Sequence, residues 1–303
     1  MSSSLPDGYT VRAATDADAE PVTALARAAE EAVRGRSSVD VDDVRSWWKL
    51  VELPTDSWLI ERAGELRAAA VLIALREVPD FWGLVRPDEV GRGLGSALLT
   101  IGENRALERG AARLHAGTFA ESASAAEFFE RRGYRDVRRY YTMHVRLTEP
   151  PVPAWPDGVR VERFRTENAR AFYDALNDAF ADEWGWEPME YDEWYRLRIE
   201  GDDSDPSLWF VVREGEEIAA VVRNDPTRVG GGWVGAIGVR PRWRRRGIGL
   251  ALLQHTFAEF YERGVTDVRL GVDTQNPSEA TRLYERAGMS VEVEDVVYER
   301  KLA

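Results

Sequence analysis

The 303-residue sequence contains no cysteine. This absence excludes disulfide scaffolds, cysteine nucleophiles and zinc sites that are built on thiolates. Histidine is also scarce, because the chain has three, His115, His144 and His255, which lie far apart and match no metal-binding spacing. We therefore expect the protein to work without a metal.

Long apolar runs are missing as well. No stretch reaches the length that spans a bilayer, and the first eight residues, M-S-S-S-L-P-D-G, lack the basic and apolar regions of a signal peptide. The formal net charge is −13, which disfavours general binding to nucleic acid or to an acidic membrane. These features predict a cytoplasmic protein with no nucleic-acid or membrane partner. They give no oligomeric state.

The residues that are present favour folded domains. Hydrophobic residues make up 44% of the chain and aromatic residues 10%, including 11 tryptophans, which argues against disorder. The length suits two domains of ordinary size. Four prolines fall within residues 148–158, where they cannot belong to a helix interior or a central strand. We place a boundary here and predict domains of residues 1–149 and 150–303.

The two halves of the chain repeat one plan. V-R-P at 85–87 recurs at 239–241, and G-R-G-L-G at 91–95 matches R-R-G-I-G at 245–249, both 154 residues later. E-F-F-E-R-R-G-Y at 127–134 matches R-L-Y-E-R-A-G-M at 282–289 with an offset of 155. A nearly constant offset predicts two copies of one fold.

Apolar periodicity, caps and turn residues predict the same order of elements in both halves. In the first half we predict strands at 9–13, 57–62, 66–75, 81–85, 113–117 and 138–147. We predict one helix that ends near residue 33, and three more at 41–50, 94–108 and 122–132. In the second half we predict strands at 158–165, 207–213, 218–223, 233–239, 266–272, 290–293 and 296–301, and helices at 167–182, 191–200, 247–262 and 277–287.

Residues 239–253 combine a strand end, a turn and a helix start. Gly247 and Gly249 let the backbone approach a ligand, while the unpaired N–H groups of the first helical turn and the helix dipole attract an anion. Arg244, Arg245 and Arg246 add positive charge at the same place. We interpret the stretch as a pyrophosphate cradle. The alternative is an ordinary loop before a charged, solvated helix start.

Two elements of the second half resemble the GNAT family of N-acetyltransferases. V-R-P-R-W-R-R-R-G-I-G, from Val239, resembles the acetyl-CoA signature Q/R-x-x-G-x-G/A that follows V-x-P in that family. D-T-Q-N-P-S-E-A-T-R-L-Y-E-R-A-G, from Asp273, resembles the family's N-x-x-A-x-x-x-Y element, with one extra residue between Asn276 and Ala280. Both elements occur in the right order and in a strand–helix context, which makes the match specific. The resemblance covers nearly the whole chain as two tandem domains.

The resemblance implies an α/β (α+β) fold, with a mixed, mostly antiparallel twisted sheet flanked by helices in each domain. It implies direct acetyl transfer from acetyl-CoA to an amine, without a metal. The N–H near Val239 would polarise the thioester carbonyl, Asn276 would contact the pantetheine or the attacked region, and Tyr284 would protonate the leaving thiolate. The implied acetyl-CoA contacts are Ile237, Gly238, Val239, Arg244, Arg245, Arg246, Gly247, Ile248, Gly249, Asn276 and Tyr284.

An amine attacks only when it is neutral, so a carboxylate must accept its proton directly or through water. Asp273, at a strand end, and Asp182 and Glu183, in the loop after a helix, are candidates between which the sequence does not choose. Each could instead be a cap or a solvated loop acid. Tyr284 could likewise be a tyrosine at the edge of the core.

The first half departs from the family pattern. It has Val90, Glu121 and Phe129 at the positions of Arg244, Asn276 and Tyr284. It keeps Arg92, Gly93 and Gly95, which leaves weak CoA binding open. Our hypothesis is that this half is catalytically silent and serves as a scaffold or a substrate wall.

The acceptor is less defined than the cofactor. Residues 182–190, D-E-W-G-W-E-P-M-E, and the helix with Trp194 and Tyr195 lie where this family builds its acceptor pocket. Acidic and aromatic side chains suit a cationic amine, although Trp184, Trp186 and Trp194 could simply pack over the sheet. The tandem arrangement also resembles that of mycothiol synthases, which acetylate the amine of a cysteinyl pseudodisaccharide, but arrangement does not fix a substrate.

The function that we predict is N-acetylation of a primary amine of a small molecule by the C-terminal domain. Two alternatives remain. A protein or peptide N-acetyltransferase would need an open groove, and a non-catalytic acetyl-CoA sensor would not need Tyr284 and Asn276.

Overall fold

The computed structural model describes residues 5–201, 205–228, 230–276 and 278–302. The chain forms two compact units, of which unit 1 comprises Met1–Arg139 with Glu294–Ala303 and unit 2 comprises Tyr140–Val293. This division differs from the predicted boundary between residues 149 and 150. The reason is that each half of the sequence contributes one strand to the unit formed by the other half.

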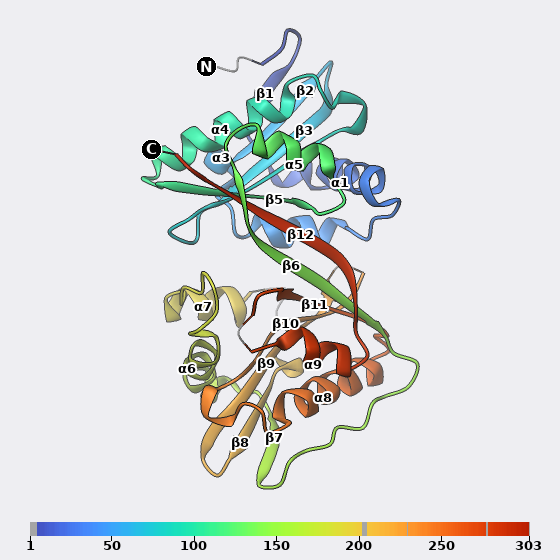
Figure 1. Ribbon diagram of the computed structural model, residues 1–303, viewed down its shortest axis with the longest axis vertical. Helices are drawn as coiled ribbons and strands as arrows, with labels where there is room; N and C mark the ends of the chain where they lie inside the picture. Colours follow the sequence, from blue (N-terminus) through green and yellow to red (C-terminus); the bar gives the residue numbers. More distant parts are fainter. Residues whose placement is uncertain (1–4, 202–204, 229, 277, 303) are drawn as a thin grey trace. The chain divides into compact units, whose positions relative to one another are not determined.

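Unit 1 is a mixed sheet with helices on both faces (Figure 1). Its strand order is β1-β2-β3-β4-β5-β12, and β4 and β5 run parallel while the other pairs are antiparallel. The strands lying in unit 1 are β1 (Thr10–Arg12), β2 (Ser57–Arg62), β3 (Glu65–Ile73), β4 (Asp80–Val85) and β5 (Arg113–Phe119). The helices are α1 (Ala19–Arg34), α2 (Val41–Trp48), α3 (Leu53–Asp56), α4 (Leu94–Glu108) and α5 (Ala123–Glu130).

Unit 2 repeats this architecture with the strand order β6-β11-β10-β9-β8-β7, in which β10 and β11 are the parallel pair. Its strands are β6 (Arg135–Arg146), β7 (Val159–Arg163), β8 (Phe210–Glu214), β9 (Glu217–Arg228), β10 (Gly231–Val239) and β11 (Asp267–Asp273). β6 begins in unit 1, and β12 (Ser290–Lys301) begins in unit 2 and pairs in the sheet of unit 1. The helices are α6 (Ala169–Phe180), α7 (Tyr191–Arg198), α8 (Ile248–Glu262) and α9 (Ala280–Arg286).

Each sheet has a hydrophobic core on both faces because successive strand residues point to opposite sides. In unit 1, Leu59 packs with α1 and α2, and the next residue, Ile60, packs with α4 and α5. In unit 2, Val211 packs under α6 and α7, and Val212 packs under α8 and α9. The predicted fold class is therefore confirmed in both units.

The exchanged strands are the main departure from the sequence-based prediction. Residues 140–146 of β6 pair antiparallel with all of β11, and residues 295–301 of β12 pair with all of β5. The prediction of two short strands at 290–293 and 296–301 is wrong, because β12 is continuous and the backbone C=O of Glu294 accepts a hydrogen bond from Ala120 N–H at 2.8 Å. Val296 and Tyr298 are buried in unit 1, where Tyr298 stacks on Phe129 at 5.3 Å.

Most other elements agree with the predicted bounds, and α4 agrees at both ends. α9 begins at Ala280 instead of 277, and Pro277 itself lies outside the described residues. Pro54 falls in the first turn of α3, where its missing N–H costs nothing. Within the described ranges, none of the helices has both the length and the apolar character that a membrane crossing requires.

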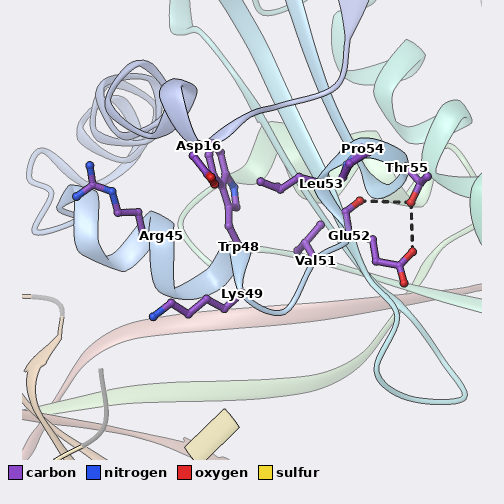
Figure 2. A pocket seen from close by; sticks show the side chains of 9 residues that line it. All are labelled: Asp16, Arg45, Trp48, Lys49, Val51, Glu52, Leu53, Pro54 and Thr55. Carbon is purple, nitrogen blue, oxygen red and sulfur yellow. Dashed lines mark hydrogen bonds between the residues drawn. The ribbon is translucent and has the colours of Figure 1, made fainter. Parts of the chain in front are cut away.

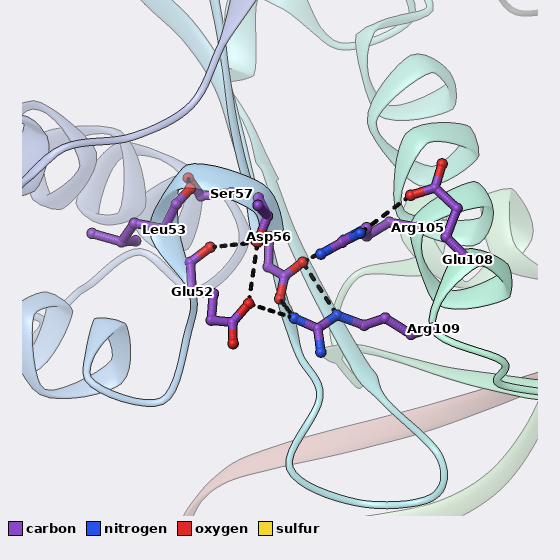
Figure 3. Close-up of polar contacts among 8 residues, drawn as sticks. Glu52, Leu53, Asp56, Ser57, Arg105, Glu108 and Arg109 are labelled. Carbon is purple, nitrogen blue, oxygen red and sulfur yellow. Dashed lines mark hydrogen bonds and ion pairs between the residues drawn. The ribbon is translucent and has the colours of Figure 1, made fainter.

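A buried ion-pair cluster fixes α3 to α4 in unit 1 (Figure 3). Asp56 is 1% exposed, and its carboxylate accepts hydrogen bonds from Arg105 Nε at 2.6 Å and from the guanidinium of Arg109. Arg109 Nη2 also donates a hydrogen bond to Glu52 Oε2 at 2.9 Å. Both arginines bind the buried carboxylate of Asp56, so we interpret the cluster as structural.

Candidate active site

A cleft opens in unit 2 where two parallel strands separate. β10 and β11 pair through Val234 and Leu270, and beyond these residues β10 continues to Val239 beside β9 alone. A register irregularity between Val234 and Ala236 accompanies the divergence, as β-bulges do. The resulting cleft has a volume of about 950 Å³ and is lined by β10, β11, the end of α6, and the starts of α8 and α9.

One wall of the cleft is a strand edge. The N–H of Arg240 donates to the C=O of Ala219 on β9 at 3.0 Å. Since alternate residues of an antiparallel strand point their backbone groups to the same side, Ile237 and Val239 direct theirs toward the cleft. Arg244 Nε donates to the Val239 C=O at 3.1 Å, consistent with that direction. An extended ligand could therefore pair with β10 as an additional strand would.

The turn between β10 and α8 has the form of an anion-binding nest. A 3-10 turn at Pro241–Trp243 leads to Arg245 and Gly247, whose φ angles are 62° and 86°. Left-handed residues in such a turn direct successive N–H groups into one concavity at the helix start. Gly247 adopts this conformation freely, whereas Arg245 adopts it at a cost of about 1–2 kcal/mol. Backbone strain of this kind concentrates at functional sites.

The three arginines of the turn point in different directions. Arg244 forms an ion pair with Asp182 at 2.6 Å and donates to the C=O of Ala179 at 2.9 Å. Arg246 pairs with Glu214 at 2.5 Å and is absent from the cleft lining. Arg245 is exposed, lines the cleft and has no ion pair among the described residues. From the sequence we expected all three arginines to face one anionic ligand. In the structure, the guanidinium of Arg245 is the one of the three that lines the cleft without an ion pair among the described residues.

Two of the predicted site glycines have a packing role. A Cβ on Gly249 would lie 2.9 Å from Leu283 Cδ1 of α9, and one on Gly238 would lie 2.7 Å from Ala179 Cβ of α6. Both distances are too short for a real side chain. Gly249 and Gly238 therefore allow α9 and α6 to approach the strands and to form the walls of the cleft, while Ile248 is buried beneath the turn.

Glu183 is the carboxylate that the structure singles out in the cleft. It follows α6, and the amide Nδ2 of Asn276 donates a hydrogen bond to its Oε1 at 2.7 Å. Burial raises the pKa of Glu183, and the hydrogen bond from Asn276 opposes that shift in part. The neighbouring charges of Asp273 and Asp182 also raise this pKa. A desolvated carboxylate in a cleft, with its pKa moved toward neutrality, is suited to accept a proton.

The two other candidate bases have structural partners. The ion pair with Arg244 lowers the pKa of Asp182, which makes it a weaker base. Asp273 is 7% exposed, and its Oδ1 accepts a hydrogen bond from Gln275 N–H at 2.8 Å, which shapes the turn after β11. The sequence could not choose among the three carboxylates. The raised pKa and the hydrogen bond from Asn276 favour Glu183 as the proton acceptor.

Asn276 and Tyr284 complete the same end of the cleft. Asn276 Oδ1 accepts hydrogen bonds from the N–H and the hydroxyl of Ser278, at 2.7 and 2.6 Å, so the amide is held in one orientation. Tyr284 of α9 is 7% exposed and lines the cleft, and its hydroxyl has no hydrogen-bond partner among the described residues. Burial raises the pKa of Tyr284, so the phenol stays protonated and can donate.

The aromatic residues of the acceptor loop divide into two groups. Trp186 stacks on Phe180 at 4.6 Å and Trp194 is buried beneath α6, so both pack the fold. Trp184 is 37% exposed and lines the cleft. Sequence analysis missed Tyr140, which lines the cleft from β6 and lies opposite Asp273 in the strand register. Nothing local in the sequence signals that β6 belongs to this unit.

The geometry defines what the cleft can hold. A strand edge, an N–H nest and one exposed arginine suit an extended arm that is joined to a pyrophosphate, as the pantetheine arm of acetyl-CoA is. Beyond the strand edge lie a desolvated carboxylate, a protonated phenol and aromatic side chains. This set can remove a proton from one reactant and give one to another. Within the described ranges, no group of three or more potential metal ligands occurs.

A second cavity, of about 680 Å³, lies in unit 1 beside α2 and α3 (Figure 2). Its lining combines apolar side chains such as Trp48 and Leu53 with Arg45 and Lys49 at the rim. None of the residues that sequence analysis singled out as catalytic or cofactor-binding belongs to it. We therefore place the candidate active site in the cleft of unit 2.

Comparison with known proteins gives a consistent result. The sequence model of the acetyltransferase (GNAT) family matches residues 21–134 and 169–289, one copy in each half. The chain is 27% identical over 316 residues to a protein named mycothiol acetyltransferase from Catenulispora acidiphila. The aligned region covers 95% of this chain and 97% of that protein.

Solved structures agree with the fold. A GCN5-related N-acetyltransferase from Sphaerobacter thermophilus is 33% identical, with a TM-score of 0.88, over 99% of this chain and 97% of that one. A tandem GNAT protein from the clavulanic acid biosynthesis pathway has a TM-score of 0.73 at 16% identity, over 97% of this chain and 99% of that one. The second likeness concerns the fold alone.

Proposed function

Because the chain belongs to the acetyltransferase (GNAT) family, we propose that it transfers an acetyl group from acetyl-CoA to the primary amine of a small molecule, in the cleft of unit 2. The observation that carries this proposal is the meeting of Glu183, Asn276 and Tyr284 at the end of a strand edge and an N–H nest. Acetyl-CoA supplies the activated acetyl thioester. The chain supplies binding, orientation and proton transfer.

The residues of the turn and of β10 hold the cofactor in this proposal. The N–H groups from Arg245 to Gly249 and the guanidinium of Arg245 bind the pyrophosphate, whereas the N–H of Arg244 donates to the C=O of Pro241 at 3.3 Å. The backbone of Ile237 and Val239 pairs with the pantetheine arm, and the N–H near Val239 stabilises negative charge on the thioester oxygen. Asp182 and Arg244 support the turn from α6, because their ion pair joins the helix end to the β10–α8 connection.

Glu183 acts as the general base. An aliphatic amine is mostly protonated near neutral pH, so it must lose a proton before it can attack. The raised pKa of Glu183 brings the carboxylate closer to the range in which it can take that proton and release it again. Asn276 is a positioning residue here, because its amide fixes the carboxylate. Tyr284 acts as the general acid that protonates the leaving thiolate of CoA.

The assignment to unit 2 rests on an internal comparison. Unit 1 carries Phe129 at the position of Tyr284 and Glu121 at the position of Asn276, and Phe129 is buried in the core against Tyr298. Phenylalanine has no proton to donate. We propose that unit 1 is catalytically silent and supports unit 2 as part of the folded scaffold.

The acceptor side of the cleft favours a cationic amine. Glu183 and Trp184 offer charge and an aromatic face, and Tyr140 adds a second ring. Because these relatives are named mycothiol acetyltransferase, the amine of a cysteinyl pseudodisaccharide is the first acceptor to test.

The test combines purified full-length protein with acetyl-CoA and a panel of amines, and it measures the release of CoA thiol. The panel contains a cysteinyl pseudodisaccharide, polyamines and a short peptide with a free N-terminus. We expect release with a small amine and loss of that release in Glu183→Gln and Tyr284→Phe. Binding of acetyl-CoA without release for any amine would favour a sensor, and release with the peptide alone would favour protein N-acetylation.

A further inference from the structure

We propose that the ion pair between Arg223 and Asp225 positions the strand edge on which unit 2 binds acetyl-CoA, because it supports a β-bulge at Gly235 that unit 1 lacks. Arg223 and Asp225 are absent from the cleft lining, so they act through the backbone of β10. The inference rests on the proposed function, since acetyl-CoA is the ligand of that proposal.

The bulge is one extra residue in β10. Val234 pairs with Asn224 of β9 and Ala236 pairs with Arg223, so two steps along β10 match one step along β9. Gly235 is the unmatched residue, and it lines the cleft. It follows directly on Val234, the last residue that pairs with β11. Because a bulge bends its strand and redirects the residues that follow, it sets the direction of the strand edge in the cleft.

Unit 1 has no counterpart of Gly235. Its strands β3 and β4 pair over six consecutive residues without a register shift. The last pair between the parallel strands is Phe81 with Ala116 in unit 1 and Val234 with Leu270 in unit 2. Ala116 and Leu270 lie 154 residues apart, as the repeat requires, whereas Phe81 and Val234 lie 153 apart. The repeat returns to 154 at V-R-P, so Gly235 is the residue that β10 has in addition.

The ion pair brackets the bulge. Arg223 lies opposite Ala236 in the register, and Asp225 lies opposite Trp233. Arg223 Nη1 donates to both carboxylate oxygens of Asp225, each at 3.1 Å. A Cβ on Gly235 would lie 2.5 Å from Arg223 Nη2 and 3.0 Å from Asp225 Oδ2. Gly235 does not have a positive φ, so the space that the ion pair takes up is what favours glycine here.

Other contacts hold this part of β9 in place. β8 pairs with β9 only as far as Val222, which leaves the following residues without that neighbour. The guanidinium of Arg223 lies 6.0 Å from the ring centroid of Trp209, and Trp209 Nε1 donates to the C=O of Asn224 at 3.1 Å. The side chains of Arg223 and Asp225 are 12% and 20% exposed. The ion pair is therefore largely buried and anchored from behind the bulge.

Unit 1 also lacks the ion pair. β3 and β9 can each be counted from the residue that pairs with the valine of V-R-P. Three and five residues further on, β9 has Arg223 and Asp225, and β3 has Val71 and Ile73. The bulge and its charged support thus occur together, in the unit to which we assign the reaction.

The ion pair and the pyrophosphate turn have separate supports. The arm of acetyl-CoA pairs with the backbone of Ile237 and Val239 in our proposal, and such hydrogen bonds weaken steeply when the strand edge is misaligned. The turn is held by Arg244, through Asp182 and the C=O of Ala179. Loss of the bulge support should weaken binding of the arm and leave binding of the pyrophosphate unchanged.

The experiment compares two ligands on the full-length protein. One is acetyl-CoA, and the other is its nucleotide part, 3′-phosphoadenosine 5′-diphosphate, which has the pyrophosphate and lacks the arm. Protection of residues 236–249 from hydrogen–deuterium exchange, followed against ligand concentration, gives each affinity at this cleft. The double variant Arg223→Val, Asp225→Ile carries the side chains of unit 1 and leaves neither charge unpaired. We expect it to bind acetyl-CoA about tenfold more weakly, as when one or two hydrogen bonds are lost, with the nucleotide affinity unchanged.

Gly235→Ala is an independent test, because the added methyl group would displace the guanidinium of Arg223. It should weaken acetyl-CoA binding alone, and it should add little in the double variant. The matched control is Arg213→Val with Glu162→Ile, which removes an ion pair between β8 and β7 whose arginine is 14% exposed. Both affinities should survive in this control. Equal weakening of the two ligands in the double variant, or undiminished binding of acetyl-CoA, would overturn the inference.

Failure of the proposed function gives a different result. If the unaltered protein binds neither ligand, the proposed function and this inference are both wrong. If the double variant loses affinity for acetyl-CoA alone but the unaltered protein acetylates no amine, the inference stands and the catalytic proposal is wrong. If an amine is acetylated and the double variant keeps its full affinity for acetyl-CoA, only the inference is wrong.

Discussion

The side-chain amide of Asn276 donates a 2.7 Å hydrogen bond to the carboxylate of Glu183, a residue 93 positions earlier in the chain. Asn276 lies in the turn after β11, and Glu183 follows α6 on the opposite side of the cleft. The bond joins the two walls and stabilises the ionised form of a carboxylate that burial otherwise disfavours. Asn276 thus influences when Glu183 carries its charge.

The first prediction concerns the pH dependence of turnover. Burial raises the pKa of Glu183, and the base works only when ionised, so kcat should rise with pH through that pKa. Glu183→Gln should lower kcat by a factor of about 10²–10⁴ and remove the acidic limb of the pH profile, in which kcat rises with pH. Asn276→Ala removes a hydrogen bond that lowers the pKa, so the limb should move to higher pH.

The measurement is kcat against pH at saturating acetyl-CoA and acceptor. Asp182→Asn is the matched control, because the ion pair with Arg244 lowers the pKa of Asp182 and leaves it unsuited to this role. Its acidic limb should persist but move to lower pH, because the Asp182 charge that raises the pKa of Glu183 is removed. An unchanged limb in Glu183→Gln would assign the base to another group.

The second prediction concerns Tyr284. Tyr284→Phe removes a buried hydroxyl that has no hydrogen-bond partner in the described part of the chain, so the fold should be unaffected. We expect kcat to fall by about 10²-fold or more while the affinity for acetyl-CoA changes little. Steady-state kinetics and titration with acetyl-CoA measure the two effects. An equal loss in both would show that the phenol contributes to binding, contrary to a general-acid role.

The third prediction separates the arginines of the turn. Arg245→Gln should raise the KM for acetyl-CoA about tenfold, since it removes a charged donor from the cleft, and the effect should shrink as salt increases. Arg246→Gln is the matched control, because that guanidinium is paired with Glu214 outside the cleft lining. Initial rates at two salt concentrations measure both variants. Equal effects of the two substitutions would contradict the assignment to Arg245.

The fourth prediction concerns stability in unit 1. Asp56→Asn leaves Arg105 and Arg109 without the carboxylate that pairs them, and we expect the free energy of unfolding to fall by about 3–5 kcal/mol. The control is Glu127→Gln, which breaks an exposed helical pair with Arg131 and should cost about 0.5 kcal/mol or less. Urea unfolding of both variants gives the comparison. A small loss for Asp56→Asn would mean that the cluster is not a stability determinant.

The repeat and the order of elements were predictable from local pattern. Leu59 and Ile60 alternate between two cores, α4 spans the predicted residues, and Gly247 lies at the predicted turn, where its φ is 86°. These features depend on neighbours in the sequence, because side-chain periods and turn conformations are local properties of the backbone. The family signature at 239–249 is local in the same way.

The exchange of β6 and β12 could not be read from pattern, because every strand carries the same period of two residues whichever sheet it joins. Tyr140 enters the cleft of unit 2, and Tyr298 enters the core of unit 1, only through this exchange. A cut at the proline-rich segment would leave each half without a strand of its sheet.

The sequence by itself determined that the protein consists of two copies of an acetyltransferase fold, each with a glycine-containing turn between a strand and a helix. Tertiary structure decided how the candidate carboxylates are paired, which arginines of the turn form ion pairs, and which unit each exchanged strand joins. Asp182 and Glu183 are adjacent in the chain, yet the first meets Arg244, 62 residues away, and the second meets Asn276. Their chemistry differs because burial and charge pairing depend on residues that folding brings together from distant parts of the chain.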